Sequence, residues 1–266
     1  MPASSRSKEF AAVTGATGAI GFAIAEQLAA LGYHVVLIAR NPEKCSRSVE
    51  KIKNITGNSD VYFKIADLSN RMSIQSLASS WDRPLHILIN NAAISPPNRM
   101  ETTGGIELQF ATNVLGYFWM TEFFSPILIE SSPARIVNVA SYWAGDLDLK
   151  DLEFKKRNYH NHESYRQSKQ ANRMLTPVFA RNLEGTSVTV NACHPGDVNS
   201  SLSNSLGFGG SQTPSEGAET PIWLASSESV QNVTGKYFER KKETNCPFSH
   251  DLLKAQQLYE ICQSYT

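Results

Sequence analysis

Short apolar runs alternate with amphipathic stretches along almost the whole chain. Runs of about four to eight residues that stay apolar throughout predict strands buried on both faces of a sheet. The predicted strands cover 9–13, 33–39, 61–66, 85–89, 135–140, 186–193 and 235–239. Helical spacing of apolar residues predicts helices over 20–31, 43–56, 70–81, 104–130, from 165 onward, 214–225 and 249–261. This alternation predicts a parallel, doubly wound α/β sheet between two helical layers.

Length and charge support a single domain that does not bind nucleic acid. The 266 residues fit one large α/β domain over 9–266, behind a flexible segment at 1–8. Lys and Arg total 25, as do Asp and Glu, so the net charge is zero and no polyanion is expected as a partner. No apolar segment suits a signal peptide or a membrane span, so a cytoplasmic protein is expected.

No group of residues has the spacing of a metal site. The four cysteines are far apart and are expected to be reduced thiols. His160 and His162 lie in a predicted loop without a cysteine partner, so a solvated loop explains them better than a metal. The acidic residues of 146–153 are interpreted as surface charge and helix-start residues. His194 is interpreted as a structural histidine whose hydrogen bonds are satisfied.

A glycine-rich turn joins the first predicted strand to the first helix. Glycines permit a tight turn and the close approach of a phosphate to the N-terminus of the helix. Together with its flanking strand and helix, the turn predicts dinucleotide binding, although glycines also simply tighten turns. Its candidate contacts are Gly15, Thr17, Gly18, Ala19, Ile20 and Gly21.

The end of the second predicted strand bears on the choice of cofactor. An NAD site usually places an acid there to accept from the ribose 2′-hydroxyl. This chain has Ala39 followed by Arg40 and Asn41. A cation without an acid favours NADP(H) over NAD(H), while an ordinary solvated charge is the alternative reading of Arg40.

Tyr165 and Lys169 are the strongest candidates for chemistry. Four positions apart, they lie on one face of the predicted helix. A neighbouring ammonium favours the phenolate and is expected to lower the pKa of the tyrosine, which suits an acid and base. Considered alone, the pair is better explained by an amphipathic helix with the tyrosine half-buried and the lysine in water. Ser141 follows the strand 135–140, at the sheet edge where ligands bind in open α/β folds.

A loop rich in Ser and Gly follows the predicted strand 186–193. It covers about 197–213 and carries scattered apolar residues, including Leu202 and Leu206. This composition predicts a mobile lid over an apolar ligand. Trp143 is either part of the same pocket or part of the core.

In this order and on these elements, the motifs resemble those of the short-chain dehydrogenase/reductase family over about 9–239. The motifs are the glycine turn at 14–21, Asp67, Asn90-Asn91-Ala92, Asn113, Ser141, Tyr165 with Lys169, and Pro195-Gly196. The resemblance implies a single-domain Rossmann fold with a seven-stranded parallel sheet and a nicotinamide cofactor. Monomer and homodimer are both compatible with the sequence.

The resemblance also implies a role for each matching residue. Tyr165 would be the general acid that protonates the carbonyl oxygen, and Ser141 would hydrogen-bond that oxygen. Lys169 would bind the nicotinamide ribose, and the backbone of Asn113 would hold a water that connects Lys169 to solvent. The other cofactor contacts would be Arg40, Asn41, Asp67, Leu68, Asn91, Ala92, Ala93, Pro195, Gly196 and Val198.

Within the family, the long stretch between Ser141 and Tyr165 is similar to the retinol dehydrogenase and WW-domain oxidoreductase branch. This implies apolar substrates, such as retinoid, steroid or xenobiotic carbonyls and alcohols. Ala19 departs from the family pattern, where most members of this length have glycine, and would cost about 1 kcal/mol if the position required a positive φ. The spacing of Gly15, Gly18 and Gly21 resembles that of nucleotide-sugar epimerases. A nucleotide-sugar epimerase and a non-catalytic NADP-binding protein therefore remain alternatives.

Overall fold

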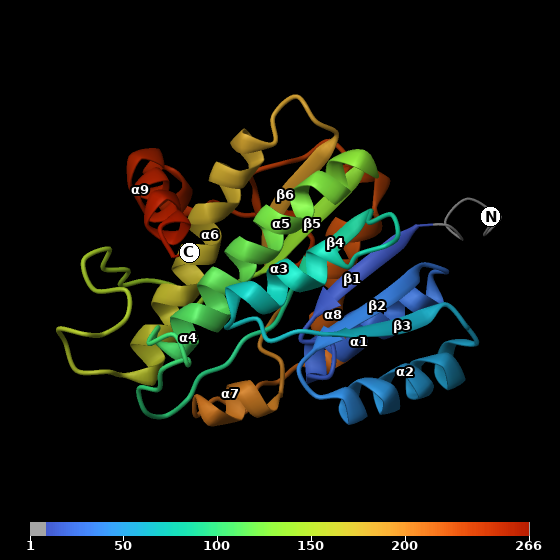
Figure 1. Ribbon diagram of the computed structural model, residues 1–266, viewed down its shortest axis with the longest axis horizontal. Helices are drawn as coiled ribbons and strands as arrows, with labels where there is room; N and C mark the ends of the chain where they lie inside the picture. Colours follow the sequence, from blue (N-terminus) through green and yellow to red (C-terminus); the bar gives the residue numbers. More distant parts are fainter. Residues whose placement is uncertain (1–8, 266) are drawn as a thin grey trace.

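One sheet runs through the computed structural model, which describes residues 9–265, so the flexible segment predicted for 1–8 lies outside the described residues (Figure 1). Its eight strands have the order β3-β2-β1-β4-β5-β6-β7-β8. They are β1 (Phe10–Thr14), β2 (His34–Ala39), β3 (Val61–Ile65), β4 (Ile87–Asn90), β5 (Ala134–Val139), β6 (Val188–His194), β7 (Tyr237–Glu239) and β8 (Lys242–Glu243). The predicted parallel α/β sheet is confirmed.

The eighth strand is the one departure from the predicted seven-stranded sheet. β8 pairs antiparallel with β7, whereas all other neighbours are parallel. Arg240 and Lys241 have φ of 49° and 62°, and they reverse the chain between the two strands. β8 is short, charged and exposed, so no apolar run signals it in the sequence.

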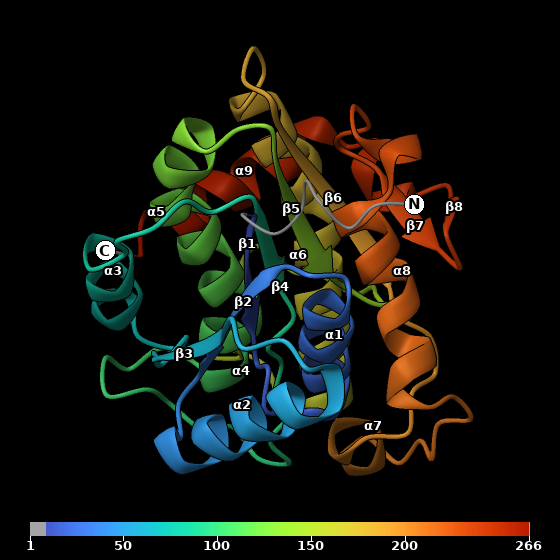
Figure 2. The ribbon, with the colours of Figure 1, turned by 90° about the vertical axis from the view of Figure 1, so that its right-hand side faces the viewer.

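Helices cover both faces of the sheet, as Figure 2 shows from the side. One layer contains α1 (Ala19–Ala30), α2 (Pro42–Thr56) and α8 (Pro214–Ser226). The other contains α3 (Arg71–Ser79), α5 (Gly116–Glu130), α6 (Asn161–Asn182) and α9 (Leu252–Gln263). The short helices are α4 (Leu108–Phe110) and α7 (Ser201–Ser205), with 3-10 turns at Glu228–Val230 and Pro247–Ser249.

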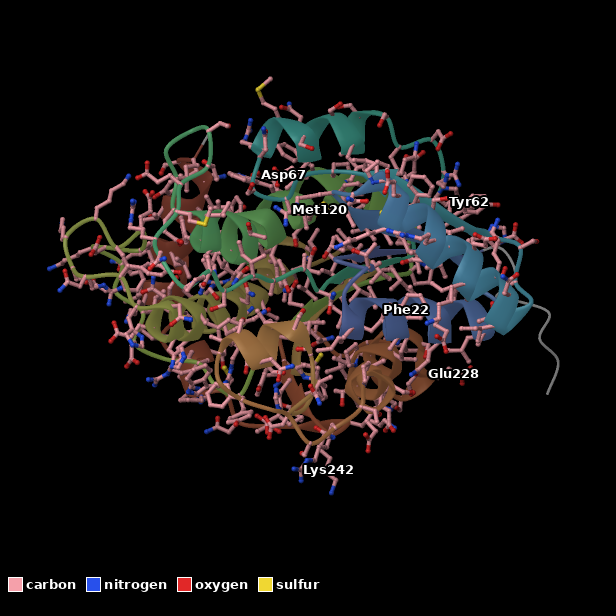
Figure 3. The ribbon with its side chains drawn as sticks, turned by 90° about the horizontal axis from the view of Figure 1, so that it is seen from below. Phe22, Tyr62, Asp67, Met120, Glu228 and Lys242 are labelled. Atoms are coloured by element: carbon pink, nitrogen blue, oxygen red, sulfur yellow. The ribbon has the colours of Figure 1, made fainter. Side chains whose placement is uncertain are left out.

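Alternate strand residues build two separate cores. In β2, Val35 and Leu37 pack against the layer of α1, while Val36 and Ile38 pack against the layer of α5. Because successive strand side chains point to opposite faces, a strand between two helical layers must be apolar throughout. Figure 3 shows the result, with Phe22 of α1 and Met120 of α5 on opposite sides of the sheet.

Two predicted helix boundaries are wrong for local reasons. The helix predicted over 104–130 begins at α4, because Gly105 has a φ of 75° and turns the chain first. Between α4 and α5 the helix widens into a π-helical turn over Ala111–Leu115. α6 begins at Asn161, so Tyr165 lies one turn inside the helix rather than at its start.

The stretch between β5 and α6 is organised by buried carboxylates, so the interpretation of 146–153 as surface charge is wrong for two of its residues. Asp151 is 7% exposed. Its carboxylate accepts hydrogen bonds from the backbone N–H groups of Lys155 (2.7 Å), Lys156 (3.1 Å) and Arg157 (3.1 Å). Burial opposes the charge, but these three donors hold the pKa of Asp151 below its usual value.

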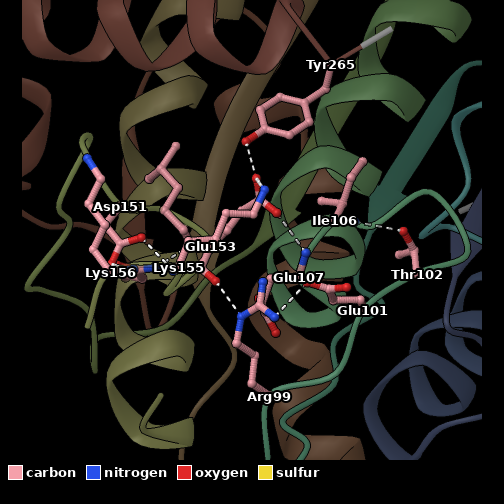
Figure 4. Close-up of polar contacts among 12 residues, drawn as sticks. Arg99, Glu101, Thr102, Ile106, Glu107, Asp151, Glu153, Lys155, Lys156 and Tyr265 are labelled. Carbon is pink, nitrogen blue, oxygen red and sulfur yellow. Dashed lines mark hydrogen bonds and ion pairs between the residues drawn. The ribbon is translucent and has the colours of Figure 1, made fainter. Parts of the chain in front are cut away.

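Glu153 ties the same stretch to two distant segments (Figure 4). Its carboxylate accepts from the backbone N–H of Glu107 (3.0 Å), the hydroxyl of Tyr265 (2.8 Å) and the ammonium of Lys155 (2.9 Å). Its backbone carbonyl accepts from Nε of Arg99 at 2.9 Å. The chain between β5 and α6 is therefore anchored to the segment before α4 and to the C-terminal segment.

Glu107 gives the fold a testable dependence on pH. Its carboxylate is fully buried and accepts from the N–H groups of Gln109 and Phe110, and burial raises its pKa to about 7. A raised pKa means that the folded state holds a proton which the unfolded state has lost. The contribution of Glu107 to the free energy of unfolding therefore decreases as the pH rises from about 4.5 to about 7.

We expect Glu107→Gln to reduce this decrease, because the amide cannot ionise and its oxygen still accepts from the backbone. Urea unfolding between pH 4.5 and 8 measures the effect. Glu101→Gln changes an exposed carboxylate of the same segment and is the matched control. Equal pH slopes for the wild type and Glu107→Gln would contradict the assignment.

Candidate active site

The glycine turn lies at the carboxyl edge of the sheet, where β1 meets β4. Gly15 has a φ of 64°, and a Cβ there would lie 2.8 Å from Cα of Ala92. A Cβ on Gly21 would lie 2.6 Å from Nδ2 of Asn91 and would also overlap the carbonyl oxygen of Gly15. Ala19 is the first residue of α1 and is not among the residues with positive φ, so its methyl group carries no conformational cost.

Thr14 joins the ends of β1 and β4, although it is not among the predicted contacts. Its buried hydroxyl donates to the carbonyl of Ile89 (3.3 Å) and accepts from the N–H groups of Asn91 (2.8 Å) and Ala92 (3.2 Å). The side chain of Asn91 donates back to the carbonyl of Thr14 at 2.9 Å. These bonds set the spacing between the two strand ends beside the glycine turn.

A cleft of about 300 Å³ opens beside the turn and contains most of the predicted cofactor contacts. Thr112 also faces it, and its buried Oγ1 has no hydrogen-bond partner among the described residues, which leaves a polar group free for a ligand. The predicted residues in the lining are Gly15, Thr17, Gly18, Ala19, Ile20, Gly21, Arg40, Asn41, Asp67, Leu68, Asn91, Ala92 and Ala93. The narrow glycine cradle and this donor set fit a dinucleotide.

Cations and a helix N-terminus meet at the far end of the cleft. Arg40 and Lys44 both line it and both are exposed. Asn41 caps α2 by accepting from the backbone N–H of Lys44 at 2.9 Å, so the positive end of the helix dipole faces the same place. The sequence alone does not predict that Lys44 faces the cleft, because only the fold determines the direction of α2.

Ser141, Tyr165 and Lys169 come together at the end of β5. The hydroxyl group of Ser141 lies close enough to that of Tyr165 to lower its pKa, and it accepts from the backbone N–H of Trp143 at 3.0 Å. The Lys169 ammonium donates to the carbonyl of Val139 at 2.9 Å and lies 5.6 Å from the ring centre of Tyr165. Tyr117 covers its other side, with the ring centre 5.4 Å away. The structure thus brings a hydroxyl, a phenol and an amine from two elements into one place.

The expectation that Lys169 lowers the pKa of Tyr165 is wrong for this structure. Burial raises the pKa of Tyr165 to about 12, and the nearby Ser141 hydroxyl offsets only part of that rise. Burial also lowers the pKa of Lys169 to about 7, so a smaller fraction of its amine is charged near neutral pH. Desolvation is the largest cause of both shifts. Tyr165 is therefore protonated at neutral pH.

Asn113 lies in the π-helical turn, and its side chain joins two segments of the candidate site. Oδ1 accepts from the N–H of Ile94 (2.9 Å), and Nδ2 donates to the carbonyl of Ile94 (2.9 Å) and to Oγ of Ser168 (3.3 Å). Turns of this kind occur often at functional sites. The side chain links the loop after β4 to α6, beside Tyr165 and Lys169.

A second cavity, of about 580 Å³, adjoins the cofactor cleft and contains Ser141 and Tyr165 in its wall. Trp143, Leu202 and Leu206 line it as predicted, and Phe208 joins them with its ring 4.7 Å from that of Trp143. Pro195, Gly196 and Val198 line this cavity rather than the cleft. The two hollows share Ile20, Ser200 and Leu202, so a ligand in one can meet a ligand in the other.

Contacts between its two ends close the loop that covers this cavity. A bridge joins Val198 to Gln212, and Asn199 donates to the carbonyl of Gln212 at 2.9 Å. α7 lies within the loop, where Ser200 and Ser203 cap each other reciprocally. The loop predicted over 197–213 therefore contains a short helix that its Ser-rich composition conceals.

His194 lines the cavity, and its interpretation as a satisfied structural histidine is wrong. Its Nδ1 is buried without a hydrogen-bond partner among the described residues. Burial lowers its pKa to about 4, so the ring is neutral at physiological pH.

Across residues 9–265, no cluster of three or more His, Cys, Asp or Glu side chains suits a metal ion. No helix within this range is both long and apolar enough to span a membrane.

Known proteins resemble the chain over most of its length. The family model described as short chain dehydrogenase matches residues 9–207. Human retinol dehydrogenase 13 is 34% identical over 268 residues, covering 93% of this chain and 81% of that protein. Human polyprenol dehydrogenase is 36% identical over 261 residues, covering 90% and 79%. A solved structure of an uncharacterized protein from Mycobacterium Paratuberculosis has a TM-score of 0.81 at 25% identity, covering 97% and 94%.

Thr14→Val tests the junction between β1 and β4. The substitution leaves two part-buried N–H groups without their acceptor, so we expect a loss of about 1 kcal/mol in the free energy of unfolding. We also expect weaker NADPH binding, because Asn91 and Ala92 line the cleft. Urea unfolding and NADPH fluorescence titration measure the two effects. Thr14→Ser keeps the hydroxyl and is the control, and a Val variant as stable as the Ser variant would refute this role.

Proposed function

The chain belongs to the short-chain dehydrogenase family, and from that premise we propose that it interconverts a carbonyl and an alcohol on an apolar substrate, using NADP(H). One observation carries the proposal. The hydroxyl groups of Tyr165 and Ser141 lie side by side in the wall of an apolar cavity that opens into a glycine-lined cleft. A proton donor in this wall supports the transfer of a proton to a substrate held in the cavity, next to a cofactor in the cleft.

The chemistry of this chain's residues follows from their protonation states. The nicotinamide, when bound, supplies or accepts the hydride. Tyr165 donates its proton to the carbonyl oxygen during reduction, because the alkoxide that forms is far more basic than a phenolate. In oxidation the phenolate of Tyr165 accepts the proton of the alcohol as the hydride leaves. Ser141 donates a hydrogen bond to the same oxygen, where negative charge develops. Because burial keeps Tyr165 protonated near neutral pH, it is ready to act as the acid in reduction.

Lys169 and Asn113 support this centre. Lys169 would hold the ribose next to the nicotinamide, and its amine, with a pKa of about 7, can exchange a proton near neutral pH. Asn113 fixes the loop after β4 against α6 through Ile94 and Ser168. When Tyr165 has given up its proton, Lys169 and Asn113 are already in position for the phenol to be reprotonated.

NADP(H) is the cofactor that the far end of the cleft favours. Arg40, Lys44 and the N-terminus of α2 converge there, and the last residue of β2 is Ala39 rather than an acid. A 2′-phosphate would gain charge-assisted hydrogen bonds from this set, whereas a 2′-hydroxyl would find no carboxylate acceptor at that strand end.

The substrate cavity favours apolar compounds. Trp143, Leu202, Leu206 and Phe208 supply most of its apolar surface. Two of the relatives are named for retinol and for polyprenol, both apolar alcohols. We propose retinoid-like or other apolar carbonyls as the substrate class.

Tyr165→Phe tests the acid. We expect kcat to fall by about 10²–10⁴-fold, because the proton donor is lost while the ring remains. The Kd for NADPH should change little, as measured by fluorescence. Activity is followed as NADPH oxidation with a panel of retinoid, steroid and xenobiotic carbonyls. Tyr142→Phe, an exposed tyrosine in the same cavity, is the matched control. Full activity of Tyr165→Phe would remove the acid assignment, and no turnover by a wild type that binds NADPH tightly would favour a binding protein.

Arg40→Ala tests the cofactor preference. Loss of one charge-assisted contact should weaken NADPH binding by about 10–100-fold and leave NADH binding nearly unchanged. Isothermal titration with each cofactor measures the difference. Arg47→Ala removes an exposed cation from α2 that does not line the cleft, and it serves as the control. Equal losses for both cofactors would argue against a phosphate contact.

A further inference from the structure

Arg173 is a buried cation on the helix that carries Tyr165 and Lys169. The three residues occur at intervals of four on α6, so their side chains lie on the same side of the helix. Arg173 is 5% exposed. Among residues 9–265, no carboxylate forms an ion pair with it.

Aromatic rings and a sulfur atom take the place of the missing carboxylate. The guanidinium carbon lies 3.7 Å from the ring centre of Tyr237 and 4.9 Å from that of Phe248. Nε donates to Sγ of Cys246 at 3.3 Å. Tyr237 and Cys246 belong to a small apolar cluster at the carboxyl ends of β5 and β6, where Phe248 packs against it. The planar guanidinium is thus held in one orientation by the C-terminal part of the chain.

The remaining contact of Arg173 points to the active site. Nη1 lies 3.4 Å from the carbonyl oxygen of Ser141 and donates to it. One turn earlier on α6, Lys169 donates to the carbonyl of Val139. Two cations on successive turns of α6 therefore hold two carbonyls, two residues apart, at the end of β5. The second of these carbonyls belongs to the residue whose hydroxyl meets Tyr165.

Packing alone does not require a charge at this position. A buried cation loses its hydration, and aromatic faces, a thiol and one carbonyl replace that hydration only in part. An unbranched apolar side chain of similar length would fill the same space without that cost. What the charge adds is the contact that holds the carbonyl of Ser141 in place.

We propose that Arg173 is a positioning residue for Ser141, which it holds through the backbone carbonyl so that the hydroxyl faces Tyr165. The inference rests on the proposed function, because it assigns Ser141 and Tyr165 to one reaction. The C-terminal segment contributes to catalysis through this contact, since Tyr237, Cys246 and Phe248 orient the guanidinium.

The test compares Arg173→Met, Arg173→Lys and Val178→Ala in the NADPH-bound protein. Val178 is fully buried on the same helix in the main core, so its truncation destabilises α6 without touching Ser141. With NADPH and all-trans-retinal, we expect Arg173→Met to lower kcat by about 10–100-fold. KM and the Kd for NADPH should change by less than about threefold, since neither ligand is contacted. Arg173→Lys should recover part of the loss, because it keeps the charge but not the planar fork.

Crystal structures of the same variants give a readout that does not depend on activity. In Arg173→Met, the Ser141 hydroxyl should turn away from the Tyr165 hydroxyl, whereas in Val178→Ala it should stay beside it. An unchanged Ser141–Tyr165 contact in Arg173→Met would overturn the proposal. So would a loss of kcat in Val178→Ala as large as that in Arg173→Met. If the wild type reduces no carbonyl, the proposed function fails, while the crystal structures still decide whether Arg173 positions Ser141.

Discussion

The hydrogen bond from the Lys169 ammonium to the Val139 carbonyl fixes where α6 meets the end of β5. Tyr165 lies one turn before Lys169 on α6, and Ser141 lies two residues after Val139. Together with the contact from Arg173 to the Ser141 carbonyl, this bond sets the distance between the two hydroxyl groups that would handle the substrate oxygen. Because Lys169 is 2% exposed, water does not compete for this bond. The rest of the site is arranged around a junction that a helix and a strand could not maintain alone.

Exclusion of water shapes the chemistry and the surrounding fold in the same way. It raises the pKa of Tyr165 and lowers that of Lys169, so the proton stays on the phenol until a stronger base arrives. It also makes the carboxylates of Asp151 and Glu153 depend on N–H and O–H donors from several segments. The long stretch between Ser141 and Tyr165 is thus ordered by buried carboxylates, although its composition is that of a surface loop.

The carboxyl edge of the sheet explains why distant segments share one site. Parallel strands end on the same side, and the order of strands reverses between β1 and β4, which opens a crevice beside the glycine turn. The loop after β6 closes over the neighbouring cavity and shares Leu202 with the cofactor cleft. A hydride donor and an apolar acceptor would be brought together there, away from bulk water.

The sequence by itself determined the parallel sheet, the glycine turn and the candidates Asn113, Ser141, Tyr165 and Lys169, because apolar periodicity, turn chemistry and motif spacing are local properties. Only the tertiary structure decided which charges are buried and what satisfies them. Thr14, Glu153 and Arg173 have ordinary local surroundings, and each gains its role from residues far away in the chain. The direction of the Tyr165 pKa shift was likewise beyond sequence reasoning. Spacing brings the ammonium near, but the depth of burial decides how strongly desolvation opposes it.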